Sequence, residues 1–229
     1  MKLAVMQPYF LPYAGYWQLI SAVDYFVIFD DVNFIKKGYI NRNSILANGK
    51  PQLITLELFG ASQNKRINEI EVGGNKKKIL KTIELSYKKA PFFDKVFPLI
   101  TEILTSDEKN LAKFVGCSLK KISDHLDLKT KFVYSSDIRK NNNLKAQDKI
   151  LEIVSLLEAT HYINAIGGQD LYDKNRFAKE NVGLNFLDTT VLEYQQFNNK
   201  FEPNLSIVDI MMFNDIGEID NILSRYKLI

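Results

Sequence analysis

The segment from Gln7 to Tyr16 brings polar and aromatic side chains to a point in the chain where a ligand can bind. It follows the apolar run Leu3–Met6 and leads directly into a helical pattern. Because the first turn of a helix has free N–H donors and a partial positive charge, this corner suits an anionic ligand. The candidate cofactor-binding residues here are Gln7, Tyr9, Tyr13, Gly15 and Tyr16.

The four residues from Tyr13 to Tyr16 have the spacing of the His-x-Gly-His element of adenylyl-transferring α/β enzymes, with tyrosine at both histidine positions. In that element the glycine lets a base or ribose approach the helix, and the flanking side chains contact phosphate. Tyrosine hydroxyls can donate to phosphate oxygens, but they carry no positive charge near neutral pH. The alternative is an aromatic cluster that holds the helix against the sheet.

Two carboxylates end the next apolar run, Tyr25–Phe29. Asp30 and Asp31 suit Mg²⁺, or a hydrogen bond to a sugar or an amine, and we assign them as candidate catalytic residues. Capping or surface solvation is the alternative role. Lys36 and Arg42 follow shortly after and complete the candidate catalytic set, because cations can neutralise charge that develops on phosphates.

Arg42 lies between two asparagines, Asn41 and Asn43. Its planar guanidinium can bind a phosphate or a carboxylate through two parallel hydrogen bonds. The neighbouring amides make Asn41 and Asn43 candidate substrate-binding residues. Placement of these polar side chains on the surface is the alternative.

A third polar segment, Asn164–Gln169, begins at the end of the apolar run Tyr162–Ala165. Its two glycines precede a helical pattern, and the backbone N–H groups of such a turn can hold an anion. A tight turn without a ligand is the alternative. We assign Asn164, Gly167 and Gly168 to cofactor binding and Tyr172 to substrate binding.

Ser206 fits the start of a helix, with Asp209 three residues later in the position of a capping box. A nucleophilic Ser206 would need a base, and no histidine follows it. The two histidines of the chain, His125 and His161, lack partners at metal-ligand spacing, so we expect no zinc and assign no metal ligand. Asn204 and Ser206 remain candidate substrate-binding residues.

Apolar strand-like runs alternate with helical patterns along the chain, which predicts an α/β fold with a mostly parallel sheet between helices, in three layers. The predicted strands are Leu3–Met6, Tyr25–Phe29, Leu53–Leu58, Lys131–Tyr134, Tyr162–Ala165 and Leu184–Leu187. The predicted helices are Tyr13–Ala22, Lys76–Lys88, Phe93–Leu104, Asn110–Leu126, Lys145–Leu157, Gln169–Glu180 and Glu218–Tyr226.

Ligands of open α/β sheets lie beyond the carboxyl ends of the strands. The loops Gln7–Tyr16, Asp30–Asn33 and Asn164–Gln169 are therefore expected to share one rim of the sheet. We expect a single domain over residues 1–229, with an insertion or edge element at about 33–72. Within that insertion the Asn48-Gly49 pair is a turn signal, which predicts a β-hairpin.

The composition is that of an ordinary globular protein, with 46% hydrophobic and 25% charged residues among 229. We expect no membrane insertion, because no run of about 18 apolar residues occurs. A net charge of +3 does not indicate nucleic-acid binding. The single cysteine, Cys117, cannot form an internal disulfide, which fits a cytoplasmic location.

Several long motifs occur in an order that resembles the WbqC-like family, from Lys2 to about Asn214. The motifs are Gln7–Ile20, Asp30–Val32, Asn41–Asn43, Tyr162–Gly168 with Leu171-Tyr172, and Phe201–Asn214. The resemblance implies a role in bacterial O-antigen and surface-polysaccharide biosynthesis. It also implies glycine transfer to an amino sugar, as described for some members.

The resemblance and the residues together suggest three hypotheses. In the first, ATP with Mg²⁺ activates glycine or another acyl group as an acyl-adenylate, and the amine of a nucleotide-linked amino sugar attacks it. This is the logic of pantothenate-synthetase-like ligases, whose nucleotidyltransferase-like (HUP-type) fold the first strand–helix–strand unit resembles. In the second, a charged tRNA or a thioester supplies the acyl group without ATP. In the third, the protein binds a nucleotide-sugar without chemistry.

Overall fold

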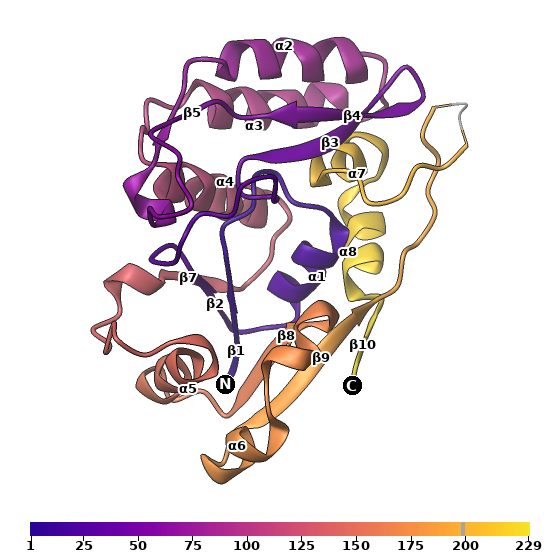
Figure 1. The fold of residues 1–229 in the computed structure, drawn as a ribbon. Coiled ribbons are helices and arrows are strands. Elements are labelled where there is room, and N and C mark those ends of the chain that lie inside the picture. Colours follow the sequence, from indigo (N-terminus) through magenta and orange to yellow (C-terminus); the bar gives the residue numbers. More distant parts are fainter. Residues whose placement is uncertain (198–199) are drawn as a thin grey trace.

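A six-stranded sheet forms the centre of the computed structural model, which describes residues 1–197 and 200–229 (Figure 1). The strand order is β10-β9-β8-β1-β2-β7. Neighbouring strands are parallel from β9 to β7, and β10 pairs antiparallel with β9. The strands are β1 (Lys2–Met6), β2 (Tyr25–Ile28), β7 (Lys131–Tyr134), β8 (His161–Ala165), β9 (Gly183–Thr189) and β10 (Tyr226–Leu228).

The central strands are buried on both faces, which explains their continuous apolar sequence. In β1, Leu3 and Val5 contact one part of the core, whereas Ala4 between them contacts the other part. Ala4 lies beside Phe26 of β2, in parallel register. The mostly parallel sheet and its flanking helices confirm the predicted fold class.

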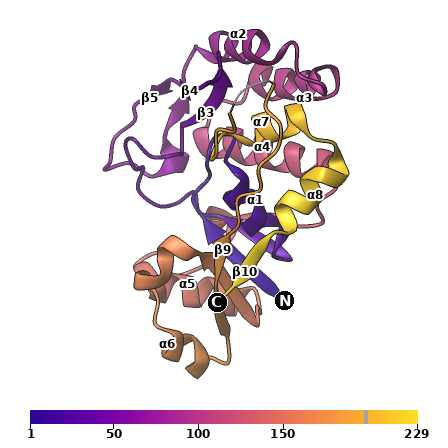
Figure 2. The same ribbon diagram turned by 90° about the vertical axis from the view of Figure 1, so that its right-hand side faces the viewer.

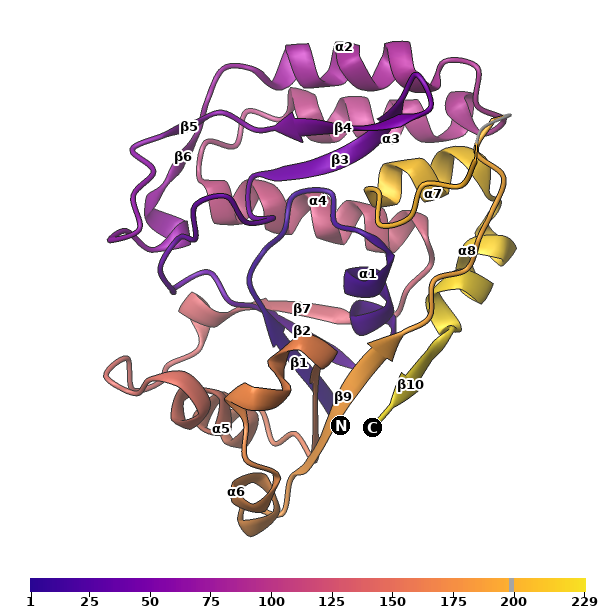
Figure 3. The same ribbon diagram turned by 45° about the vertical axis from the view of Figure 1, so that its right-hand side comes forward.

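Helices cover the two faces of the sheet, as Figures 2 and 3 show. On one face lie α1, α4 and α8, with α2, α3 and α7 packed beyond them; α5 and α6 cover the other face. The helices are α1 (Ala14–Ser21), α2 (Lys76–Tyr87), α3 (Phe93–Thr105), α4 (Leu111–His125), α5 (Ala146–Leu156), α6 (Lys174–Lys179), α7 (Ile207–Phe213) and α8 (Ile216–Ser224).

The segment after β2 leaves the main sheet, as the sequence predicts. β3 (Arg42–Ala47) and β4 (Lys50–Thr55) form an antiparallel hairpin. Its turn, Asn48-Gly49, has both φ angles positive, at 51° and 73°, which suits the tight hairpin turn that this dipeptide favours. A shorter pair, β5 (Leu58–Phe59) and β6 (Glu71–Val72), follows it.

Two predicted helices were wrong in their extent. The predicted helix over 169–180 is divided into a 3₁₀ helix, Ile166–Leu171, and α6, because Asp173 caps a new helix by accepting from the N–H of Asn175 at 2.9 Å. The last helix ends at Ser224, and the chain continues as β10. β10 forms because the edge of β9 offers unpaired backbone groups; Phe186 and Ile229 exchange two hydrogen bonds there.

Among the described residues, no helix combines the length and the apolar character needed to cross a membrane. The single-domain organisation and the resemblance to nucleotidyltransferase-like folds stay predictions.

Candidate functional site

A cavity lies where the chain order of the parallel strands reverses. From β1 the chain continues on one side to β2 and β7, and it returns on the other side as β8 and β9. The carboxyl ends of β1 and β8 therefore border a crevice, which is the place where open α/β sheets bind ligands. The cavity has a volume of about 480 Å³, within the usual range of small-molecule sites. We call it the switch-point pocket; its polar and aromatic lining includes Gln7, Tyr9, Tyr13, Tyr16, Asn164 and Tyr172.

Two of the three predicted loops meet at the switch-point pocket. The loop after β1 contributes Gln7 and Tyr9, and the loop after β8 contributes Asn164 and the two glycines. The loop after β2 contributes only Phe29. The expectation of one shared rim therefore holds for the loops after β1 and β8, whereas the carboxylates after β2 lie elsewhere.

Tyrosines give the switch-point pocket neutral hydroxyl groups. Burial raises the pKa of Tyr9 and of Tyr172, and it raises the pKa of Tyr13 to about 12. The Tyr16 hydroxyl donates to the backbone oxygen of Gln7 at 2.8 Å, and its ring stacks on Tyr9 with centroids 5.1 Å apart. These phenols are therefore protonated near neutral pH, and they offer hydrogen bonds and aromatic faces rather than charge.

No acidic or basic side chain lines the switch-point pocket in the part of the chain that the structure describes. The pocket instead contains the amides of Gln7 and Asn164 among aromatic and aliphatic side chains. A charged group without a partner is costly to bury, whereas hydroxyl and amide groups can be satisfied by such neighbours. The lining therefore suits a neutral, hydroxyl-bearing or amide-bearing ring.

The glycines after β8 lie inside the 3₁₀ helix and differ in their surroundings. A Cβ atom at Gly168 would lie 2.5 Å from Nδ2 of Asn164, whereas a Cβ atom at Gly167 would meet nothing within 4 Å. Asn164 is buried, and its Oδ1 accepts from the N–H of Ala165 at 2.9 Å. Gly168 therefore provides the space that lets the Asn164 amide reach the pocket.

Gly15 does not provide open space for a ribose. A Cβ atom there would lie 2.7 Å from Cγ2 of Thr189, so a side chain at the end of β9 already occupies that position. The neighbouring Tyr13 ring is 3.2 Å from the same point. The aromatic and methyl contacts fit the alternative role of this helix start, in which it is held against the sheet.

The carboxylates after β2 are used in structural contacts. Asp30 is buried and accepts from the backbone N–H and the hydroxyl of Ser136, at 2.9 and 2.7 Å, and from Asn68 at 3.2 Å. Asp31 forms an ion pair with Lys140 at 2.6 Å, and both side chains are almost completely buried. Neither carboxylate lines the switch-point pocket, so the structure does not bring these predicted catalytic residues to it.

The polar residues of the insertion make structural hydrogen bonds, and those of Asn43 reach the loop after β1. Arg42 donates to the backbone oxygens of Gly38, at 3.2 Å, and Lys37. Asn43 is buried and donates to the oxygen of Leu11 at 2.9 Å. The other predicted residues of this segment are Asn41, which donates to the oxygen of Leu56 at 2.8 Å, and Lys36, which is exposed.

Ser206 is a helix cap, as the sequence predicts. It is completely buried, donates to the oxygen of Leu11 at 2.7 Å and accepts from the N–H of Val208 at 3.2 Å. The predicted capping box with Asp209 is wrong. The Asp209 carboxylate turns into the core, where a network of phenol and amide donors described below holds it.

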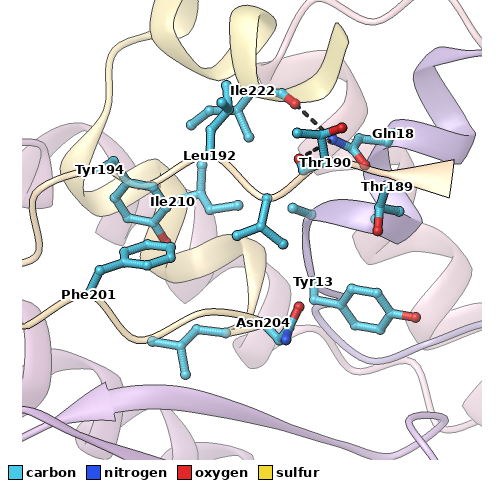
Figure 4. Close-up of a pocket in the computed structure, with 14 residues that line it drawn as sticks. Tyr13, Gln18, Thr189, Thr190, Leu192, Tyr194, Phe201, Asn204, Ile210 and Ile222 are labelled. Carbon is cyan, nitrogen blue, oxygen red and sulfur yellow. Dashed lines mark hydrogen bonds between the residues drawn. The ribbon is translucent and has the colours of Figure 1, made fainter. Parts of the chain in front are cut away.

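Tyr13 and Gly15 also border a second, small cavity of about 40 Å³. Figure 4 shows Tyr13, Gln18 and Asn204 around it. Gln18 borders it, and the Gln18 amide nitrogen donates to the oxygen of Ile222 at 2.9 Å. Asn204 also borders this small cavity, not the switch-point pocket. The volume is enough for a few water molecules, so we do not include it in the ligand site.

Sequence reasoning missed the aliphatic lining of the switch-point pocket and some residues at its border. Leu171 and Thr189 line it, and the ring of Tyr39 lies 5.5 Å from that of Tyr9. Single residues at the end of an element or in a turn carry no local signal of this kind. Among the described residues, no group of three or more histidine, cysteine, aspartate and glutamate side chains could hold a metal ion.

The comparisons with known proteins agree over almost the whole chain. The model of the WbqC-like protein family matches residues 7–221. The chain is also 26% identical over 230 residues to the uncharacterized protein Rv1507c of Mycobacterium tuberculosis (strain ATCC 25618 / H37Rv), an alignment that covers 98% of each chain. No solved structure matches.

Proposed function

The chain belongs to the WbqC-like protein family, and from this membership we propose that it acylates the amine of a nucleotide-linked amino sugar. The acyl group is glycine or another small acyl group, and the product serves bacterial surface-polysaccharide (O-antigen) biosynthesis in the cytoplasm. The observation that carries the proposal is the neutral, aromatic and amide-lined pocket at the switch point of the sheet. Aromatic faces and amides are the groups that recognise a sugar ring.

The neutral lining favours an acyl donor that arrives already activated. The sugar amine enters the neutral pocket as the free base, because an ammonium group would be buried there without a partner. Its lone pair attacks the acyl carbon of an ester or thioester, and the carrier leaves with the proton that the amine loses. This step needs close positioning more than a charged catalyst, and positioning alone can contribute a large rate enhancement. A charged tRNA or a thioester is therefore the proposed donor.

If free glycine is the donor, the reaction is proposed to require ATP and Mg²⁺. The residues at the switch-point pocket do not fit them, because Thr189 fills the space at Gly15 and the Asp31 carboxylate is paired with Lys140. We therefore derive no step through an adenylate.

The proposal is tested with glucosamine linked to uridine or thymidine diphosphate as acceptor. Three reactions run in parallel, with glycyl-tRNA, with a glycyl thioester, and with glycine plus ATP and Mg²⁺; mass spectrometry detects the amide product. We expect product with a preformed donor. Product and AMP only in the third reaction would favour the adenylate route, and absence of product in all three would contradict the transferase proposal.

A binding protein without chemistry is the second candidate function, and the lack of a charged group in the switch-point pocket is the observation that favours it. A ligand at about 100 times its dissociation constant adds about 2.7 kcal/mol to the free energy of unfolding. Thermal stabilisation by the nucleotide-sugar without turnover with any donor would support this candidate.

Gly168→Ala is expected to weaken sugar binding about tenfold, because the added methyl group displaces the Asn164 amide from the pocket. Calorimetric titration with the nucleotide-sugar measures the change. Gly74→Ala is the matched control and should bind normally, because an added Cβ there would lie 3.9 Å from the Glu57 carboxylate and Gly74 does not line the pocket. In an Asn164→Ala background, Gly168→Ala should add little; an unchanged penalty there would contradict the role of Asn164.

The affinity for a neutral sugar is expected to change less than about twofold between about pH 6 and pH 9. None of the described residues that line the pocket titrates in this range, since burial raises the pKa of the tyrosines, that of Tyr13 to about 12. Titration with N-acetylglucosamine, which carries no ionisable group, measures the dependence. A midpoint within this range would reveal a titrating group in the pocket and contradict the neutral lining.

A further inference from the structure

An exposed aromatic ring extends the switch-point pocket outward. Tyr39 lies in the insertion and is 46% exposed. Its ring centroid is 5.5 Å from that of Tyr9 and 5.3 Å from that of Tyr13, and both of these tyrosines line the pocket. These three neighbouring rings lead from the pocket lining to an exposed side chain, and we call them the tyrosine shelf.

The backbone holds Tyr39 in place. The N–H of Phe10 donates to the oxygen of Tyr39 at 2.9 Å, which ties the insertion to the loop after β1. The next residue, Ile40, is buried, as is Phe34 at the start of the same segment. An aromatic ring that is already oriented loses little conformational freedom when a ligand stacks on it.

Because its lining is neutral, the switch-point pocket can accept only the uncharged part of a nucleotide-sugar. A diphosphate carries charge that the pocket cannot compensate, so it stays outside. The insertion that carries Tyr39 also carries two exposed cations, Lys36 and Lys37, just before it in the chain. With the sugar inside and the diphosphate at the mouth, the nucleobase lies on the solvent side of the mouth.

We propose that Tyr39 stacks on the nucleobase of the nucleotide-linked sugar, so that the tyrosine shelf is the nucleoside subsite. All nucleobases have a face that stacks on an aromatic ring, and removal of such a ring typically weakens binding about tenfold or more. This inference rests on the proposed function, because it assumes that the sugar occupies the switch-point pocket.

The test compares two ligands in calorimetric titrations of the full chain, namely glucosamine linked to uridine diphosphate, and glucosamine 1-phosphate, which lacks the nucleoside. Tyr39→Ala should weaken binding of the first about tenfold and leave the second unchanged. Tyr39→Phe should bind both normally, because it keeps the ring. Phe59→Ala, which removes a 56% exposed ring elsewhere in the insertion, is the matched control.

The outcomes separate the inference from the proposed function. If the wild type binds the nucleotide-sugar and Tyr39→Ala binds it equally well, the nucleoside subsite is wrong and the proposed function stands. An equal loss for both ligands also overturns the subsite. If the wild type binds neither ligand, both proposals fail. Dimerisation that is lost in Tyr39→Ala would show a protein interface instead and overturn the subsite.

Discussion

Replacing Lys140 by methionine is expected to lower the free energy of unfolding by about 3–5 kcal/mol, because the Asp31 carboxylate is then buried without its cation. The ion pair is 2.6 Å long, and its side chains are 5% and 1% exposed. Urea unfolding followed by circular dichroism measures the change. The double variant Asp31→Leu/Lys140→Met should recover much of the loss, since two apolar side chains can replace a buried ion pair.

The stability that the Asp31–Lys140 ion pair contributes is expected to depend on pH. Burial favours a raised pKa for Asp31, but the hydrogen bonds of Lys140 and Ser135 and the charge of Lys140 together outweigh it and hold the pKa below its usual value. Such a carboxyl contributes stability above its unfolded pKa, near 3.9, and loses it as the pH falls through the lower folded value. The difference between wild type and Lys140→Met should therefore be largest near neutral pH and shrink in acid.

The matched control is the ion pair between Lys129 and Asp127, whose side chains are 82% and 80% exposed. Lys129→Met should change the stability little, because solvent screens an exposed pair. Equal losses in Lys129→Met and Lys140→Met would contradict the argument from burial.

Asp209→Ala is the second variant with a large expected effect, a loss of about 3–5 kcal/mol in the free energy of unfolding. The Asp209 carboxylate accepts from the hydroxyls of Tyr87 and Tyr194, at 2.7 Å each, and from the amide of Gln196 at 2.6 Å. Removal of the carboxylate takes the acceptor away from the buried Tyr87 hydroxyl and the half-buried Tyr194 hydroxyl. The buried Gln196 amide keeps only its bonds to Tyr194 and Glu202. Thermal and urea unfolding measure the loss.

The Asp209 carboxylate also holds the connection between β9 and α7 in place, because Tyr194 and Gln196 in that connection donate to it. Gln196 exchanges further hydrogen bonds with the backbone of Glu202, at 3.1 and 2.7 Å. Asp209→Ala should therefore increase proteolytic cleavage in this connection more than elsewhere in the chain. In a Tyr194→Phe background the loss should be smaller, because one donor is already gone; a fully additive loss would contradict the network.

Burial raises the pKa of Asp209, although its three donors lower it in part. A carboxyl with a raised pKa stabilises the fold most below its unfolded pKa, near 3.9, and that contribution is lost as the pH rises through the folded value. Asp209→Asn keeps an acceptor and removes the buried charge. It should therefore cost less stability near neutral pH than Asp209→Ala.

The residues assigned from local patterns differ in how well the structure places them. Gln7, Tyr9, Asn164 and Tyr172 lie together in the switch-point pocket, because each belongs to a loop or element at the carboxyl end of β1 or β8. Asp30 also follows the carboxyl end of a strand in the same sheet. Its carboxylate nevertheless does not face the pocket and accepts hydrogen bonds from the backbone N–H and the hydroxyl of Ser136. Position in the fold was predictable, whereas the direction of each side chain was not.

The amino-acid sequence by itself determined the five parallel strands of the main sheet, the hairpin turn at Asn48-Gly49 and the loops at the carboxyl edge, because apolar periodicity and turn residues act over a few neighbouring positions. It did not determine β10, which it predicted as part of a helix. The tertiary structure alone decided which polar groups stay free for a ligand. Asn43 and Ser206 both bind the backbone of Leu11, from positions 32 and 195 residues away in the chain. A hydrogen bond of such a span leaves no local pattern, since its partner is brought close only by folding.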